Sequence, residues 1–203
     1  MNTKIAVVSL ALTAVLYGAN SQAQAGLFVE PAITYEVGSS SVDYPSPLDN
    51  SSGSVNGFGI GARVGFHVME TVFLALDGRY SKPTFKDSSN DISVGADAWH
   101  LGATAGAQMP IMGIRVWGSY LFAGKLDPGE DGGFDVAFND GRGYRFGVGA
   151  RVSVVSLNLE YQRLNYGTTK VDKVGPFETD ASFDDVDLDD NAWILSASFP
   201  LEF

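Results

Sequence analysis

The last thirteen residues, Asn191 to Phe203, read N-A-W-I-L-S-A-S-F-P-L-E-F. From Trp193 onward every odd-numbered position is apolar, whereas positions 196, 198 and 202 carry serine or glutamate. This period of two is typical of a β-strand with one apolar and one polar face. Such a strand needs two different surroundings. We interpret the apolar face as facing lipid and the polar face as facing an enclosed interior.

The amino-terminal end has the pattern of a secretory signal peptide. Lys4 precedes an apolar run over residues 5–17, and the Ala-Gln-Ala sequence at 23–25 supplies the small residues of a cleavage site. The run is shorter than the roughly 20 residues that a membrane-spanning helix needs. We therefore expect residues 1–25 to be removed on export and residues 26–203 to form one domain.

Composition excludes several classes of protein. The formal net charge of −11 argues against nucleic acid as a partner, because phosphates are bound by lysine and arginine. The chain has no cysteine, so it uses no disulfide bonds. Glycine is abundant, and no amphipathic helical pattern of convincing length is present, which favours an all-β fold. No motif indicates a cofactor, and we expect none.

The alternation recurs in eight segments of about ten residues, the length of a tilted transmembrane strand. The apolar rows lie at 27–37, 58–66, 72–80, 99–107, 114–122, 144–152, 157–161 and 193–203. Tight turns alternate with polar segments at 39–56, 82–95, 123–142 and 167–190. This pattern predicts a transmembrane antiparallel up-and-down β-barrel with eight strands, periplasmic termini and four long external loops.

A sheet can span a bilayer only if it has no open edge, so the last strand must pair with the first. Pro31 and Pro200 fall on this seam, and each lacks a backbone N–H. We expect a bulge or a missing hydrogen bond there. Aromatic residues also group at both ends of the apolar rows, as in interfacial girdles. The predicted loop-side girdle contains Tyr35, Tyr80, Trp99, Tyr120, Phe122, Tyr144, Tyr161 and Trp193, and the turn-side girdle contains Phe66, Phe199 and Phe203.

With these features the chain resembles the small outer-membrane barrels of Gram-negative bacteria, of the OmpX, OmpA-domain and OmpW kind. The resemblance covers residues 26–203 and rests on strand number, the rhythm of turns and loops, and Phe199, Leu201 and Phe203 on one face of the last strand. It implies a location in the cell outer membrane, among lipid and lipopolysaccharide. It also implies that these three residues are read by the barrel-assembly machinery. It leaves the activity open, because this fold hosts pores, adhesins and enzymes.

Charged side chains of both signs occupy the inward rows. Because an unpaired buried charge is very costly, we expect an ion-pair network that fills the narrow lumen. Counting from the turns puts Glu30 level with Arg63, Asp77 one residue higher, and Arg151 near Glu160. The predicted network comprises Glu30, Glu36, Arg63, Asp77, Arg79, Arg115, Arg145, Arg151, Glu160 and Glu202.

A second inward set is apolar. Leu121, Leu164 and Ile194 lie toward the loops, and Trp117 lies lower. These residues predict either a hydrophobic cap over the charges or a small apolar binding pocket, as in OmpW-like barrels.

The fourth polar segment is strongly acidic. Its residues Asp185, Asp187 and Asp189 are candidates for a loose divalent-cation site that bridges to lipopolysaccharide phosphates. They do not form an EF-hand, because Asp190 stands where that motif requires glycine.

Neither of the two histidines indicates catalysis. His67 and His100 are not followed by the serine of the His-x-Ser pair that some barrel deacylases use, and the chain is too short for a ten-stranded protease. We expect the protein not to be an enzyme. Two hypotheses remain: a structural or surface-interaction barrel with acidic external loops, and a narrow channel or transporter of small solutes, hydrophobic ones included.

Overall fold

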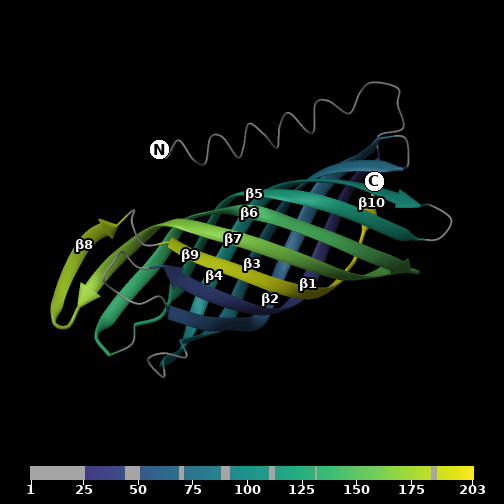
Figure 1. The fold of residues 1–203 in the computed structure, drawn as a ribbon. Coiled ribbons are helices and arrows are strands. Elements are labelled where there is room, and N and C mark those ends of the chain that lie inside the picture. Colours follow the sequence, from purple (N-terminus) through teal and green to yellow (C-terminus); the bar gives the residue numbers. More distant parts are fainter. Residues whose placement is uncertain are drawn as a thin grey trace.

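The computed structural model describes residues 26–43, 51–68, 71–87, 92–109, 113–130, 132–183 and 187–203. The predicted signal peptide, residues 1–25, lies outside this part of the chain. Antiparallel strands make up the described residues and curve into a ring (Figure 1). Within the described ranges, no helix is long and apolar enough to cross a membrane.

Each strand of the ring pairs with its neighbour in sequence. The strands are β1 (Leu27–Asp43), β2 (Ser51–Val68), β3 (Val72–Asp87), β4 (Ile92–Met109), β5 (Ile114–Pro128), β6 (Phe134–Val152), β7 (Val155–Val174), β8 (Phe177–Phe183), β9 (Asp187–Ser198) and β10 (Leu201–Glu202). The last two are successive parts of one strand, since β9 and β10 both pair with β1, and β9 also pairs with β7. This closes a ring of eight, as predicted, while β8 lies outside it and pairs with β7.

The proline seam interrupts the final strand. The N–H of Phe199 donates to the carbonyl of Pro31 at 2.9 Å, but Pro31 has no N–H with which to return the bond. The register is the same on both sides of the break, with Ala32 opposite Ser198 and Val29 opposite Leu201. The predicted irregularity is therefore confirmed, in the form of a missing hydrogen bond and not of a bulge.

The outer wall is apolar and the inner wall is polar, as the alternation predicts. Every residue of the predicted loop-side girdle is exposed on the outer wall. On the turn side Phe199 and Phe203 are exposed, and Phe66 is half-buried. Exposed apolar and aromatic side chains in this arrangement fit a hydrocarbon environment bounded by two interfaces.

Inward glycines make room for large side chains to lie across the lumen. A Cβ atom at Gly147 would lie 2.3 Å from the Trp117 ring, and one at Gly106 would lie 2.3 Å from the Phe73 ring. Each ring therefore lies directly over a neighbouring strand at a position that only glycine leaves open. The glycine-rich inward rows are what allow a narrow barrel to hold aromatic residues in its interior.

The prediction of four long loops is wrong for most of the residues assigned to them. The polar segments continue the sheet: β1 runs to Asp43, β2 begins at Ser51, and β7 reaches Val174 before turning into β8. The strands of the ring therefore reach 20 residues, against the predicted ten or so. The apolar alternation stops at the bilayer interface, whereas backbone pairing does not need lipid and continues into water.

We call the end of the barrel that carries the extended hairpins the hairpin end. The opposite end, which carries the tight turns together with Leu27 and Phe203, is the turn end. The β7–β8 hairpin projects beyond the ring at the hairpin end (Figure 1).

Candidate functional site

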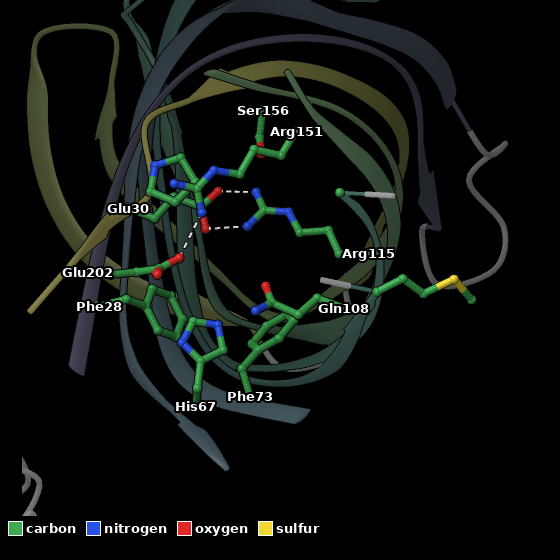
Figure 2. Close-up of a pocket in the computed structure, with 12 residues that line it drawn as sticks. Phe28, Glu30, His67, Phe73, Gln108, Arg115, Arg151, Ser156 and Glu202 are labelled. Carbon is green, nitrogen blue, oxygen red and sulfur yellow. Dashed lines mark hydrogen bonds and ion pairs between the residues drawn. The ribbon is translucent and has the colours of Figure 1, made fainter. Parts of the chain in front are cut away.

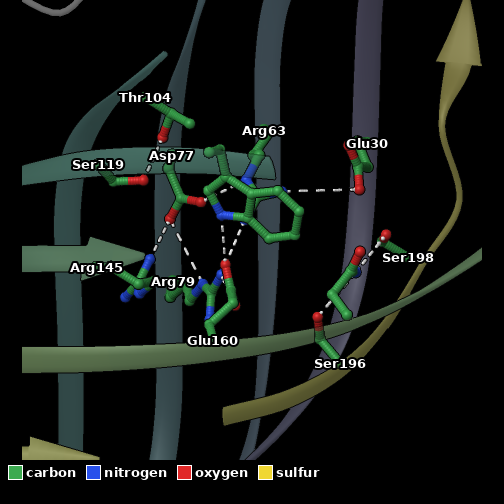
Figure 3. A network of polar contacts seen from close by, with 12 residues as sticks. Glu30, Arg63, Asp77, Arg79, Thr104, Ser119, Arg145, Glu160, Ser196 and Ser198 are labelled. Carbon is green, nitrogen blue, oxygen red and sulfur yellow. Dashed lines mark hydrogen bonds and ion pairs between the residues drawn. The ribbon is translucent and has the colours of Figure 1, made fainter. Parts of the chain in front are cut away.

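The centre of the lumen is a layer of paired charges. Glu30, Arg63 and Asp77 are direct neighbours across β1, β2 and β3, so Glu30 is level with Arg63 as predicted. Asp77 also lies level with Arg63, and the prediction of one residue higher is wrong. Arg63 donates from Nε to Asp77 at 2.8 Å and from Nη2 to Glu160 at 2.5 Å (Figure 3).

Glu160, on β7, joins both walls of the barrel and is fully buried. Its two oxygens accept hydrogen bonds from Arg63 and, at 2.5 Å, from Arg79. The indole N–H of Trp117 donates to the same carboxylate at 2.9 Å, and the Arg63 guanidinium lies 4.4 Å from the indole centroid. Trp117 is therefore a member of the charged layer and not of an apolar pocket.

Arg145 completes the layer on the opposite wall and is fully buried. It donates to Asp77 at 2.7 Å and to the side-chain oxygen of Gln162 at 3.0 and 2.5 Å. Sequence reasoning did not assign a role to Gln162. The available signal was that Gln162 shares the inward row of Glu160, where a polar residue must find a partner.

A second group lies nearer the turn end. Arg115 holds the Glu30 carboxylate with both terminal nitrogens, with one contact at 2.7 Å. It also donates to Asn158 and Ser198, each at 3.1 Å. This two-nitrogen geometry combines charge with directional hydrogen bonds. We call the combined set, Glu30, Arg63, Asp77, Arg79, Arg115, Trp117, Arg145, Glu160 and Gln162, the lumen network.

Glu36 lies apart from these arginine contacts. It is buried and accepts a hydrogen bond from Ser81 at 2.9 Å. Neutral pairs extend the polar interior: Thr104 and Ser119 are 2.7 Å apart, and Nε2 of His100 is 2.9 Å from the Tyr166 hydroxyl. His100 is therefore a buried residue whose neighbour is a phenol.

Arg151 and Glu202 were predicted as members of the network, and the structure places them elsewhere. They pair with each other at 2.7 Å on the turn-end rim, where their side chains are 37% and 48% exposed. The predicted closeness of Arg151 to Glu160 is wrong. The tight turn after Val152 pairs Arg151 with Ser156, and Glu160 lies four residues further on, roughly 13 Å along the strand.

Leu121 and Leu164 form a hydrophobic cap at the hairpin end. Both are fully buried in a cluster with Ala96, Ala98, Leu126, Phe138, Tyr166 and Leu188. Ile194 is also buried, but neither hydrophobic cluster includes it, and Trp117 belongs to a separate cluster with Phe28, Phe73 and Ala75. The prediction that all four line one pocket is therefore wrong. The cap interpretation holds for the two leucines, which are fully buried in one cluster.

Two described cavities lie away from the cap. One, of about 70 Å³, opens at the turn end and is lined by Phe28, His67, Arg115 and Glu202 among others (Figure 2). The other, of about 10 Å³, lies beside Arg63 and Asn158. The larger cavity has room for ordered water.

The candidate cation site cannot be assembled from the described residues. Asp185 and the side chain of Asp187 lie outside them. Asp189 lies 3.9 Å from Arg163 and accepts a hydrogen bond from Asn165 at 3.3 Å. Among the side chains that the structure describes, no group of three His, Cys, Asp or Glu residues is arranged for a metal ion. The divalent site stays a prediction.

Charges on the hairpins differ from those of the lumen in being exposed to water. Lys173 of β7 donates to Glu130, beyond the end of β5, at 2.6 Å. This hydrogen bond to the carboxylate raises the pKa of Lys173 above its usual value. The pair ties two neighbouring hairpins together outside the membrane-spanning part of the barrel.

The predicted assembly signal lies on the outer wall. Phe199, Leu201 and Phe203 are all exposed there, and the N–H of Phe203 donates to the carbonyl of Leu27 at 2.8 Å. Recognition by the assembly machinery stays a prediction.

A closed antiparallel ring with an apolar, aromatic-banded exterior and a polar, packed interior defines a transmembrane β-barrel. The chain belongs to the outer membrane protein beta-barrel domain family, whose model matches residues 9–199. That family points to the outer membrane of Gram-negative bacteria. Among curated proteins, none matches the sequence significantly.

Three solved structures are similar to this chain. The outer membrane protease OmpT from Escherichia coli is similar with a TM-score of 0.50 and 10% identity, covering 88% of this chain and 97% of its own. Neisserial surface protein A is similar with a TM-score of 0.47 and 14% identity, covering 85% of this chain and 96% of its own. Ail of Yersinia pestis is similar with a TM-score of 0.43 and 16% identity, covering 85% of this chain and 99% of its own. At such identity the likeness to OmpT shows the fold alone, and the expectation that this chain is not an enzyme stays a prediction.

Proposed function

We propose that this protein is a non-conducting structural barrel of the outer membrane that presents acidic β-hairpins at the cell surface. The observation that carries the proposal is the lumen network. Arg63 from β2 and Glu160 from β7 meet across the interior, and both are buried.

A permeating ion would have to break this layer. Arg63, Arg79 and Arg145 are all held by carboxylates at 2.8 Å or less. Separating a buried pair leaves unpaired charges away from bulk water, which costs several kcal/mol per ion. The hydrophobic cap adds a second barrier at the hairpin end, where Leu121 and Leu164 leave no exposed surface.

The hairpins support the surface role. Among the described residues β8 pairs with β7 alone, so its other edge carries unpaired N–H and C=O groups. Such an edge can accept an extended segment of another chain. The acidic residues beside it, Glu178 among them, favour a partner segment rich in lysine and arginine.

Planar-bilayer recording of the refolded protein tests the proposal. We expect no stable conductance steps, with a known porin recorded in parallel as a positive control and co-flotation with liposomes confirming insertion. Discrete steps from the wild-type protein would overturn the proposal and favour the narrow channel or transporter.

A second measurement tests the surface role. The barrel in lipid nanodiscs is titrated with a fluorescent oligolysine peptide and, as a control, with an oligoglutamate peptide. We expect saturable binding of oligolysine alone, weakened by Glu178→Lys. Equal binding of both peptides would contradict the role of the acidic hairpins.

A further inference from the structure

We infer that Arg142 and Arg163 form a site on the outer wall that binds the phosphate of a phosphorylated lipid headgroup, that of lipid A in the outer leaflet. The inference rests on the orientation in the proposed function, with the hairpin end at the cell surface. It concerns the lipid-facing wall and is independent of whether the lumen conducts.

The two arginines lie at the level of the headgroups. Arg142 is two residues beyond Tyr144 on β6, and Arg163 is two residues beyond Tyr161 on β7, each toward the hairpin end. Residues two apart share a face of a strand, so both arginines point outward with the girdle tyrosines. Both are exposed, and the Arg163 side chain is 66% exposed. Girdle aromatics mark the membrane interface, so a cation one step further meets phosphate groups.

The register brings the two arginines within reach of one phosphate. Tyr144 pairs with Arg163, and Arg142 pairs with Asn165. Arg142 and Arg163 are therefore diagonal neighbours on adjacent strands, about 7–8 Å apart. Two guanidinium groups on long side chains can close that distance around a tetrahedral anion, and guanidinium donors match phosphate oxygens in pairs.

Both arginines are poorly satisfied within the protein. The side chain of Arg142 makes no hydrogen bond or ion pair with any residue that the structure describes. Arg163 has one ion pair among the described residues, with Asp189 at 3.9 Å. Charges at this spacing on an exposed face hold each other weakly.

Elsewhere at this level the cations are already neutralised. Lys82, two residues beyond Tyr80 on β3, lies 3.3 Å from Asp97. Lys125 of β5 lies 2.5 Å from Asp127. On β1 the residue two beyond Tyr35 is Val37, which carries no charge. Among the described cations at this level, those on β6 and β7 are therefore the ones held least closely by carboxylates.

Aromatic pairs flank the arginines on the membrane side. The rings of Tyr120 and Tyr144 are 5.5 Å apart, and those of Tyr161 and Trp193 are 5.2 Å apart. They offer a surface for the sugar and the first acyl carbons beneath the phosphate. Since the whole chain carries a formal net charge of −11, an anion is attracted only locally, where exposed arginines lack close carboxylates.

Native mass spectrometry of the detergent-solubilised barrel tests the site. The ligands are bisphosphorylated lipid A and the same lipid after enzymatic dephosphorylation. We expect the wild type to bind the phosphorylated lipid preferentially, Arg142→Gln and Arg163→Gln each to weaken binding about tenfold, and the double variant about a hundredfold.

Lys82→Gln is the matched control, because that lysine lies at the same level and is held by Asp97. It should change binding less than about twofold, in keeping with the small effects of exposed pairs. Unchanged urea midpoints of all variants would show that the barrel is intact. Equal lipid A binding by the double variant and the wild type, or equal binding of the dephosphorylated lipid, would overturn the inference.

The two proposals fail separately. Arginine variants that bind lipid A normally in a barrel that stays electrically silent would remove the lipid site alone. Conductance by a wild-type barrel that still binds lipid A through these arginines would remove the structural role alone.

Discussion

The lumen network and the hairpins both carry paired charges of both signs, but in opposite surroundings. Glu160 is fully buried and touches two arginines and an indole, whereas Lys173 and Glu130 form one pair with 33% and 46% of their side chains exposed. A charge shielded from bulk water needs several partners to offset its lost hydration. A charge exposed to water needs only one screened contact. Residue type alone therefore does not indicate a role: the same residue types brace the barrel inside and face solvent outside.

The largest expected effect comes from removing a central member of the lumen network. Glu160→Ala leaves Arg63 and Arg79 buried without a shared carboxylate, which should lower the free energy of unfolding by about 3–5 kcal/mol. Urea unfolding in lipid bilayers measures this loss. The matched control is Glu202→Ala, which removes the exposed rim partner of Arg151 and should cost at most about 1 kcal/mol. Equal losses would erase the distinction between buried and exposed charge.

A slightly smaller loss is expected from the hydrophobic cap. Leu121→Ala opens a cavity in a fully buried cluster and should cost about 3 kcal/mol. The same urea titration measures it, and a hydrophobic dye reports on the space created. Saturable binding of the dye to the wild type, abolished by Leu121→Arg, would mean that the cap is a pocket after all.

Glycines that face the lumen should be less tolerant than glycines that face lipid. A methyl group at position 147 meets the Trp117 ring at 2.3 Å, so Gly147→Ala should cost about 1–3 kcal/mol through overpacking. At Gly118 the nearest atom to an added methyl lies 3.5 Å away, on Phe146, and Gly118→Ala should be nearly neutral. If the two substitutions shift the urea midpoint alike, the glycines are not what admits the indole.

The smallest effect belongs to the exposed pair. Lys173→Gln should leave the urea midpoint unchanged, because water replaces the lost contact. The hydrogen bond to Glu130 raises the pKa of Lys173. The attraction between the two charges is therefore complete below the usual lysine pKa and disappears as the pH rises through the raised value. A ¹³C NMR titration of the lysine Cε should show a lower midpoint in Glu130→Gln. Identical midpoints would mean that the two residues do not interact in solution.

The local pattern was sufficient for much of the architecture. The direction of each side chain follows from a period of two, which is why the outward position of Trp193 and the inward position of Arg145 could both be read from the sequence. The proline seam could be predicted too, because a missing N–H is a property of the residue itself. The long loops could not, because polar side chains in water are compatible with strand and loop alike.

Register across the hairpins was partly within reach. Glu30 and Arg63 could be placed level by counting from the chain ends and turns, and the structure pairs them directly. The same counting placed Arg151 near Glu160 wrongly, because a small error at a tight turn is carried along the whole strand.

What the sequence determined by itself is the division of this chain into a lipid-facing wall, an inward charged wall and a seam that must close. Only the tertiary structure decided which acid meets which base. Arg63 and Glu160 are 97 residues apart and touch because ring closure brings β2 opposite β7, while Trp117 turns its N–H into the same layer. Contacts across a lumen depend on barrel radius, strand stagger and side-chain rotamers together, and none of these is a property of neighbouring residues.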